Sequence, residues 1–414
     1  MERINYKDYI KILFFFMLML IFYNNSYSQS ESATYEFLIF DNVYHGGRSL
    51  GMGGTSIAIG GDFSNAEKNP ANLIMVPRSL IEIDISYSSF TRSVYNSDSS
   101  FSNTVPSFFG AALNYGSLAF GFFQHTAYKV NEKYATNNFS LPIDVNLPSL
   151  NVDRDLSLAL RGFSVSILLT NDIAFGIGFR KGSLKFQSNS YREALLEEVE
   201  FDFTNSLIDI SDSDSSWSFG VLFNPKQQFS FALSYNMGLS YSIKETQRYL
   251  LSSQLLLSEL KEYQLNVPKN LNIGFGYDFG KVKLALDMSN VYYSNLLKDG
   301  MQMSEIKEGA ENFVVKDIKE FHFGIEIPIT IAKKYVLSFR GGSQYIPFHG
   351  IKYEGTSGNL IIDNLFSSLY PKGDNEFGIS FGTGLNIKNL SFIDAGFMFS
   401  SKRKSIAITG GVCF

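Results

Sequence analysis

Histidine and carboxylate side chains are the groups of this chain that could do acid–base chemistry. The four histidines are His45, His125, His322 and His349. His322 follows Glu320 and precedes Glu326, and a base beside a carboxylate is a minimal arrangement for proton transfer. No serine-containing nucleophile elbow accompanies this group. The sequence therefore predicts no catalytic residue, and it favours a protein that is not an enzyme.

Two further motifs fit metal or phosphate sites poorly. The acidic stretch DISDSD, Asp209–Asp214, lacks the glycine and the terminal glutamate of a calcium loop, so we expect a solvated loop. GFGYDFGK, Gly274–Lys281, lacks the glycine spacing of a phosphate-binding loop and the Ser or Thr that follows its lysine. We predict no metal site and no cofactor. The net charge of -5 gives no reason to expect nucleic acid as a partner.

The N-terminus has the features of an export signal. Basic residues precede an apolar run of twelve residues, 12–23, which is shorter than the ~20 residues of a membrane-spanning helix. Small residues at 26–28 suit a signal peptidase, so residues 1–28 are predicted to be a signal peptide. Cys413 is the only cysteine, which argues against a secreted module framed by disulfides.

Alternation of apolar and polar residues dominates the chain after residue 78. In IEIDIS, residues 81–86, isoleucines alternate with Glu82, Asp84 and Ser86, so one face of a strand is apolar and the other polar. Most such segments run ten to sixteen residues, enough for the ~9–11 residues of a tilted strand that crosses a bilayer. We predict fourteen of them, at 79–90, 107–116, 118–130, 156–169, 172–187, 215–224, 227–243, 270–279, 282–293, 318–330, 334–346, 376–387, 390–400 and 404–414.

Short and long connections alternate between these segments. Tight turns are predicted at 114–117, 171–172, 224–226, 279–281, 331–333 and 388–389. Long polar loops are predicted at 91–106, 131–155, 188–214, 244–269, 294–317 and 347–375. This asymmetry is typical of a barrel in the bacterial outer membrane, whereas a soluble propeller or sandwich should have shorter strands and similar loops at both ends. The predicted fold class is all-β, a transmembrane antiparallel barrel of fourteen strands over residues 79–414.

One irregularity and one set of side chains refine this prediction. The alternation in the fourth segment changes near Arg161–Gly162, which we interpret as a bulge or a misplaced boundary. We expect the polar side chains of the lumen face to form ion pairs or to contact an inner segment. They include Arg180, Asp278, Lys283, Asp287, Glu320, Glu326 and Arg340. We also expect Phe323→Arg, on the lipid face, to impair assembly more than Glu326→Arg.

The glycine-rich stretch GGRSLGMGGTSIAIGGDFSNAEKNPANL, residues 46–73, precedes the first strand. Glycine permits tight turns and a close approach to a wall, and Asn69-Pro70 suits a turn. A barrel of fourteen strands has a wide lumen. We therefore predict that residues 29–78 form a hatch inside the barrel.

This stretch resembles the N-terminal hatch of the FadL/TodX family of outer-membrane transporters for hydrophobic compounds. The residues that carry the resemblance are Arg48, Gly51, Met52, Gly53, Gly54, Asp62, Asn69, Pro70 and Ala71. The resemblance implies passive uptake of long-chain fatty acids or aromatic hydrocarbons. It also implies capture by outer loops, release as the hatch shifts, and sideways exit through a gap where one strand kinks inward. The PorV/PorQ proteins of type IX secretion have a similar opening and form the alternative.

Two of the outer loops are expected to contain helices, in residues 191–210 and 246–263. The second loop has apolar residues at helical spacing, and an apolar helix outside the membrane would make a groove for a hydrophobic ligand. Its candidate capture residues are Tyr249, Leu250, Leu256, Leu257, Leu260 and Tyr263. The alternative is that these helices only pack over the barrel mouth. The terminal Phe414 resembles the signal of the barrel assembly machinery, so the expected partners are that machinery, outer-membrane lipid and a hydrophobic ligand.

Overall fold

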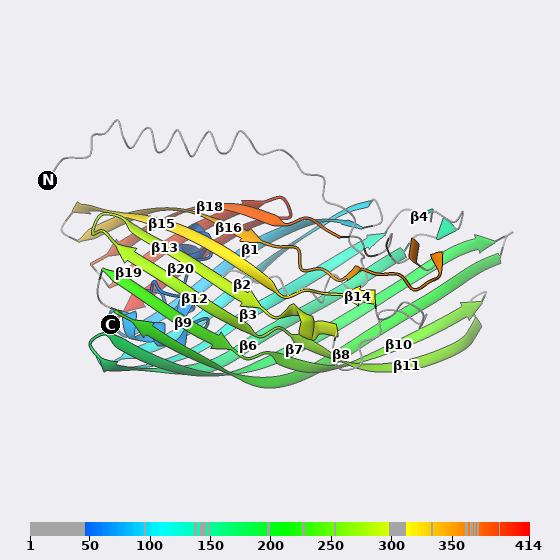
Figure 1. Ribbon diagram of the computed structural model, residues 1–414, viewed down its shortest axis with the longest axis horizontal. Coiled ribbons are helices and arrows are strands. Elements are labelled where there is room, and N and C mark those ends of the chain that lie inside the picture. Colours follow the sequence, from blue (N-terminus) through cyan, green and yellow to red (C-terminus); the bar gives the residue numbers. More distant parts are fainter. Residues whose placement is uncertain are drawn as a thin grey trace, which may run out of the picture.

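A computed structural model describes residues 46–414, apart from 95–96, 136–138, 141–145, 148–149, 197–198, 226–227, 252–253, 298–311, 333, 361–362, 365–366, 368–369, 371 and 389. The predicted signal peptide and the start of the predicted hatch, residues 29–45, lie outside the described residues. The described chain forms a closed antiparallel barrel of fourteen strands, as the sequence predicts (Figure 1). None of its described helices is long and apolar enough to cross a membrane.

The wall follows the chain order, with each strand paired to the next. Its strands are β1 (Leu80–Val94), β2 (Ser97–Asn114), β3 (Leu118–Ala135), β6 (Leu150–Thr170), β7 (Ile173–Leu196), β8 (Val199–Phe223), β9 (Phe229–Asn236), β12 (Asn270–Asp278), β13 (Lys283–Val291), β15 (Ile318–Ala332), β16 (Tyr335–Ile346), β18 (Glu376–Ile387), β19 (Ser391–Ser400) and β20 (Arg403–Cys413). Pairing of β1 with β20, from Leu80↔Cys413 to Phe90↔Arg403, closes the ring. Closure gives the first and the last strand a partner, so the sheet has no edge strand.

The remaining elements lie inside the barrel or at one of its ends. The strands are β4 (Phe139–Ser140), β5 (Asn146–Leu147), β10 (Leu239–Leu251), β11 (Gln254–Val267), β14 (Phe313–Val314) and β17 (Lys352–Tyr353). The helices are α2 (Gly47–Gly51), η2 (Phe63–Ala66), η3 (Pro70–Met75) and η4 (Tyr293–Leu297). β10 and β11 continue β9 and β12 past breaks at Gly238 and Pro268, and they pair with each other as a hairpin.

A belt of exposed apolar side chains surrounds the barrel. Every wall strand contributes at least one of them: Ile81, Phe109, Phe122, Phe163, Phe175, Trp217, Phe229, Phe275, Leu286, Phe323, Phe339, Phe377, Phe397 and Ile408. Phe109, for example, is 55% exposed and Phe122 63% exposed. A continuous apolar surface of this extent is unfavourable in water, so the belt is the part of the wall that faces lipid.

The two ends of the barrel differ. At the end that we call the turn end, short turns join the strands where the sequence predicts them, for example between Asn114 and Leu118. Asn224 and Lys388 have positive φ angles of 53° and 56° in two of these turns. At the opposite end, which we call the mouth, several predicted loops are wrong. Most residues of 91–106, 188–214 and 244–269 extend the wall strands as hairpins.

The two helices predicted at the mouth are also wrong. Residues 191–196 belong to β7 and 199–210 to β8, and residues 246–251 belong to β10 and 254–263 to β11. The ladder between β10 and β11 places opposite charges side by side, with Lys244 against Glu262 and a nitrogen–oxygen distance of 3.0 Å. Such cross-strand pairs and the backbone ladder outweigh the helical spacing of the leucines.

The change of pattern near Arg161–Gly162 has a different cause from the predicted bulge. Both residues sit in unbroken register with β3 and β7. Toward the turn end the lumen face of β6 carries buried Ser164 and Ser166, whereas toward the mouth it carries buried Leu156, Leu158 and Leu160. The strand therefore keeps its orientation along its length. Between the apolar belt and the mouth, its outer face meets water, whereas its inner face meets the apolar side chains of the lumen.

Candidate functional site: the inner segment and the apolar lumen

The glycine-rich stretch lies inside the barrel at the turn end, where it appears in blue in Figure 1. We call residues 46–78 the inner segment. Nearly all of residues 46–76 are buried. Its helices contact β1, β2, β3, β6, β7, β8, β16, β18, β19 and β20. Residues that are far apart in the chain thus meet in the lumen, which the inner segment fills at this end.

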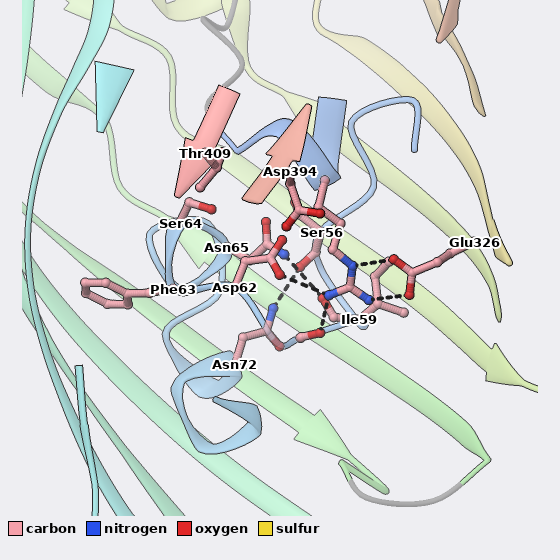
Figure 2. A network of polar contacts seen from close by, with 12 residues as sticks. Ser56, Ile59, Asp62, Phe63, Ser64, Asn65, Asn72, Glu326, Asp394 and Thr409 are labelled. Carbon is pink, nitrogen blue, oxygen red and sulfur yellow. Dashed lines mark hydrogen bonds and ion pairs between the residues drawn. The ribbon is translucent and has the colours of Figure 1, made fainter. Parts of the chain in front are cut away.

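Arg48 of α2 is the centre of a buried ionic network. Its guanidinium donates to both carboxylate oxygens of Glu326, with Nε–Oε2 2.8 Å and Nη2–Oε1 3.1 Å. Nη1 also donates to Asp62 Oδ1 at 3.1 Å. Arg340 shares Glu326 and binds Asp394 Oδ1 at 2.6 Å. Figure 2 shows Asp62 and Glu326 joined by dashed lines to one guanidinium group, with Asp394 nearby. The network joins the inner segment to the wall.

Wall carboxylates also hold the backbone of the inner segment. Asp287 of β13 accepts the N–H groups of Ser56 and Ile57 at 2.6 and 3.0 Å. Glu82 of β1 accepts those of Phe63 and Ser64 at 2.8 and 3.2 Å. An unpaired N–H inside a barrel would carry the full cost of desolvation, so these acids stabilise an otherwise irregular chain.

Gly51 and Gly53 of the motif lie against β15, β16 and β18. Gly53 has a positive φ of 71°, and a Cβ there would lie 2.5 Å from the carbonyl oxygen of Phe323. Its N–H donates to Ser380 Oγ at 2.8 Å. Met52 is fully buried. Only a residue without a side chain can approach β15 this closely, which accounts for glycine at position 53.

Asn69, Pro70 and Ala71 form the start of η3. The Asn69 side chain accepts the N–H of Ala71 at 3.1 Å and donates to the carbonyl oxygen of Ile57 at 2.9 Å. Pro70 occupies the first helical position, where its missing N–H has no cost. Gly220 on β8 leaves the space for the Asn69 amide.

Replacing Asn69 with alanine removes the cap of η3 and its bond to Ile57. We expect the inner segment to be destabilised by about 1–2 kcal/mol, the usual cost of a lost cap. Limited proteolysis of the folded barrel should then cleave within residues 46–78 faster than in the wild type. Asn65→Ala is the matched control, because the bond from its side chain to the carbonyl oxygen of Ile59 is long at 3.4 Å. Equal cleavage of both variants would contradict this role.

His322 contacts the inner segment from β15. Its Nδ1 lies 2.8 Å from the carbonyl oxygen of Gly53, and its Nε2 lies 3.5 Å from Glu320 Oε2. Since a carbonyl can only accept, Nδ1 carries the proton in this contact. His322 and its neighbour Glu320, which suggested acid–base chemistry in the sequence, thus help to hold Gly53 in place. The described residues contain no group of three or more His, Cys, Asp or Glu placed to bind a metal.

The lumen above the inner segment has a large apolar lining. Buried side chains of the mouth half form one cluster, which we call the lumen cluster. It includes Phe90, Phe101, Tyr128, Leu156, Leu158, Leu160, Phe186, Tyr241, Ile243, Phe313, Tyr353 and Tyr370. A cavity of about 110 Å³ lies where this cluster meets the inner segment, with Leu158 and Leu160 on one side and Lys68 and Asp287 on the other. The cavity is therefore lined by both apolar and polar side chains.

The candidate capture residues lie on the β10–β11 hairpin rather than on a helix. Tyr249 is paired with Leu257, and Leu250 with Leu255. Leu260, opposite Thr246, is 63% exposed. Leu256 and Tyr263 are also strand residues of β11.

A small cap lies at the mouth beside the lumen cluster. β14 pairs with β17, and the Phe313 ring meets Tyr353 and Tyr370 edge to face. Asp363 fixes the loop behind β17: the N–H of Ser357 donates to its Oδ1 at 2.8 Å and the hydroxyl of Tyr353 at 2.7 Å. These bonds lower the pKa of the Asp363 carboxyl.

The pairing of β2 with β3 ends part-way up the wall. The last pair is Phe108↔His125, and β3 has an irregularity between Thr126 and Tyr128. Beyond this point, side chains bridge the two strands where the structure describes them: Asn103 Nδ2 donates to the carbonyl oxygen of Lys129 at 2.8 Å. The wall is weakened here toward the mouth.

Three solved structures resemble this barrel over most of the chain. A FadL homologue from Pseudomonas aeruginosa has a TM-score of 0.68 at 9% identity, covering 90% of this chain and 99% of its own. The Pseudomonas putida toluene transporter TodX has a TM-score of 0.58 at 12% identity, covering 90% and 98%. The Ralstonia pickettii toluene transporter TbuX has a TM-score of 0.57 at 13% identity, covering 89% and 98%. The chain has the FadL/TodX fold.

Sequence comparison alone gives no such result, since no protein-family model and no curated protein matches the chain. The resemblance seen in residues 46–73 is nevertheless confirmed at the level of fold. Within the FadL/TodX fold, the sequence did not single out Glu82, Asp394 or Thr409 as contacts of the inner segment. The sequence feature that could have identified them is an acidic or hydroxyl side chain on the lumen face of an otherwise apolar strand, as in IEIDIS.

Proposed function

We propose that this chain is a passive channel of the bacterial outer membrane for hydrophobic small molecules, such as long-chain fatty acids or aromatic hydrocarbons. The observation that carries the proposal is the lumen cluster, an apolar lining in the half of the barrel that leads from the mouth to the inner segment. A barrel built for ions or sugars would have a polar lining throughout. TodX and TbuX, which have this fold, are described as toluene transporters.

Ligand capture would begin at the mouth. The β10–β11 hairpin carries exposed Leu260, and the cap presents Phe313, Tyr353 and Tyr370 to the lumen cluster. A hydrophobic molecule would leave water there and move down to the cavity above the inner segment. The driving force is the burial of its apolar surface, so no energy source is required.

Release would require the inner segment to act as a hatch. It fills the turn end, yet its backbone is irregular and held mainly by side chains of the wall. A rearrangement of its bonds to Asp287 and Glu82 would open a path without unfolding a strand. The incomplete pairing of β2 with β3 offers a sideways exit as well. We further propose that the C-terminal strand, ending at Phe414, is recognised by the barrel assembly machinery.

A lumen variant tests the proposal. Leu158→Asn places an amide in the apolar lining, at a cost of about 1–3 kcal/mol for a polar group without a partner. We expect uptake of a fluorescent long-chain fatty acid into proteoliposomes to slow about tenfold. Ser157→Asn, on the opposite face of the same strand, is the control and should leave uptake unchanged. Equal uptake by both variants would refute an apolar route through the lumen.

The secretion alternative makes a different prediction for cells. Deletion of the gene should reduce uptake of fatty acids or aromatic hydrocarbons if the chain is a channel. If it instead serves type IX secretion, as the PorV/PorQ proteins do, the deletion should remove surface-attached cargo proteins and leave uptake intact.

A further inference from the structure

The wall is interrupted a second time, between β8 and β10. β8 pairs with β9 from Ser218↔Asn236 to Phe223↔Phe231, and with β10 from Glu245↔Ile208 to Arg248↔Asn205. The N–H of Met237 still donates to the carbonyl oxygen of Trp217. Between this bond and the second ladder, the described residues of β8 and β10 form no ladder pair. We call this stretch, residues 209–216 of β8 opposite 238–244, the seam.

Two aspartates replace the missing backbone bonds of the seam. Asp214 Oδ2 accepts the N–H of Ser240 at 2.7 Å, and Asp212 Oδ2 accepts that of Ser242 at 2.8 Å. The other oxygen of each carboxylate accepts the N–H of the next residue on β8, at 2.7 Å in both cases. The acidic motif predicted as a solvated loop is therefore a strand segment, and two of its acids join neighbouring strands.

β10 lies on the lumen side of β8 along the seam. Asp212 and Asp214 share the inward face of β8 with buried Ser216, so a strand that they reach must be displaced inward. The faces of β10 agree with this displacement. Met237 is 40% exposed, but Leu239, two residues later, is only 4% exposed, and Tyr241 is fully buried. The face that points inward changes at Gly238, as at a bulge.

The lumen approaches the outer surface at this place. A notch of about 200 Å³ is lined by Asp214, Ser240, Asn266 and Lys269, and both the notch and the lumen cavity are lined by Leu239 and Val267. Leu239 and Val267 thus lie between the two spaces. Among the described residues of the seam, the hydrogen bonds that join β8 to β10 run to the carboxylates of Asp212 and Asp214, whose exchange with water is easier than the loss of a paired ladder.

The position of the seam relative to the membrane follows from the outer face of β8. Trp217 and Phe219 are 42% and 37% exposed and belong to the apolar belt, whereas Ser215 and Ser213 beyond them are exposed and polar. Tryptophan prefers the boundary between hydrocarbon and headgroups. The seam therefore begins at the boundary of the belt, where lipid headgroups lie.

We propose that the seam is a lateral gate for single-chain amphiphiles, held shut by Asp212 and Asp214. When the aspartates release Ser240 and Ser242, the tail of the amphiphile passes Leu239 into the lumen cluster while its headgroup stays among Ser240, Asn266 and Lys269. The gate joins the membrane surface to the lumen at a site separate from the β2–β3 interruption. It builds on the proposed channel function by adding a second route for the ligand.

Hydrogen exchange of the purified barrel in nanodiscs tests the seam itself. In Asp212→Ala/Asp214→Ala, the amides of Ser240 and Ser242 should exchange about tenfold faster, since each loses a charge-assisted bond. Amides of β9 should keep their protection. Asp209→Ala is the control: Asp209 faces outward, bonds the Gln187 side chain, and should leave the seam unchanged. Unchanged exchange at Ser240 and Ser242 would overturn the proposal.

Photolabelling tests passage through the seam. Nanodiscs that contain a diazirine-labelled dodecanoate should label residues 239–243 several-fold more in the double variant than in the wild type or Asp209→Ala. Faster exchange without increased labelling would mean a loose wall but no gate, and would overturn the proposal. If the double variant fails to form a heat-modifiable barrel, the single substitutions are measured in the same way. Loss of uptake in Leu158→Asn tests the channel function separately.

Discussion

Replacing Arg48 with methionine should free the inner segment and convert the plugged barrel into a measurable ion pore. Methionine keeps most of the length of the side chain but removes the guanidinium that neutralises Glu326 and Asp62. Glu326 retains Arg340, but Asp62 is left buried without its cation. Breaking one partner of a buried pair costs about 3–5 kcal/mol. That is enough to displace a short irregular segment while the strands stay paired.

Single-channel recording in planar bilayers measures this effect. The wild type should be closed or nearly closed to small ions, and Arg48→Met should show frequent open events. Arg78→Met is the matched control, because Arg78 is the exposed arginine at the end of the same segment. Both proteins should keep the gel shift of a folded barrel on heating. A folded Arg48→Met with wild-type conductance would refute a central role for Arg48.

Phe323→Arg should nearly abolish assembly into the membrane. Phe323 is 41% exposed on the lipid-facing side of β15, and an arginine at the midplane costs about 2–4 kcal/mol. This range lowers the equilibrium constant for folding by about thirtyfold or more. The yield of heat-modifiable barrel on folding into vesicles measures it. Ser289→Arg on the neighbouring β13 is the control. Ser289 lines the lumen cavity, so this variant should fold far better. Equal yields would contradict the assigned register.

The structure changes the comparison that the sequence suggested for this experiment. Glu326 was expected to tolerate arginine because it faces the lumen. It does face the lumen, but it is only 4% exposed and accepts hydrogen bonds from Arg48 and Arg340. A further cation there would be repelled by Arg48, Arg340 and Lys283. We therefore expect Glu326→Arg to be damaging as well, and Ser289 is the better control.

The barrel itself could be predicted because lipid and lumen impose opposite demands on alternate residues. Ile81, Ile83 and Ile85 face lipid, and the intervening Glu82 and Asp84 are fully buried. This period of two marked the fourteen segments and the turns at one end. The same reasoning placed Glu326, Asp287 and Arg180 in the lumen, where they do contact the inner segment.

The mouth could not be predicted in the same way, because the strands leave the lipid before they end. Toward the mouth from Arg161, the lumen face of β6 carries Leu160, Leu158 and Leu156 and then the buried Arg154, whereas the outer face carries Asp153 and Asp155. A prediction that assumes lipid on the outer face interprets such a stretch as a loop or an amphipathic helix. The helix wrongly predicted in residues 246–263 has this cause. Pairing partners such as Arg48 and Glu326, separated by 278 residues, also leave no local signal.

Pairing of β1 with β20 has a consequence for how the molecule is made. The inner segment directly precedes β1, and it bonds to wall strands from both ends of the chain, including Thr409 of β20 through Gly47. Once β1 and β20 have paired, the closed wall blocks lateral entry of a polar segment. The inner segment must therefore enter the lumen before β1 pairs with β20. The order of these two steps during biogenesis decides whether the assembled barrel is plugged or open.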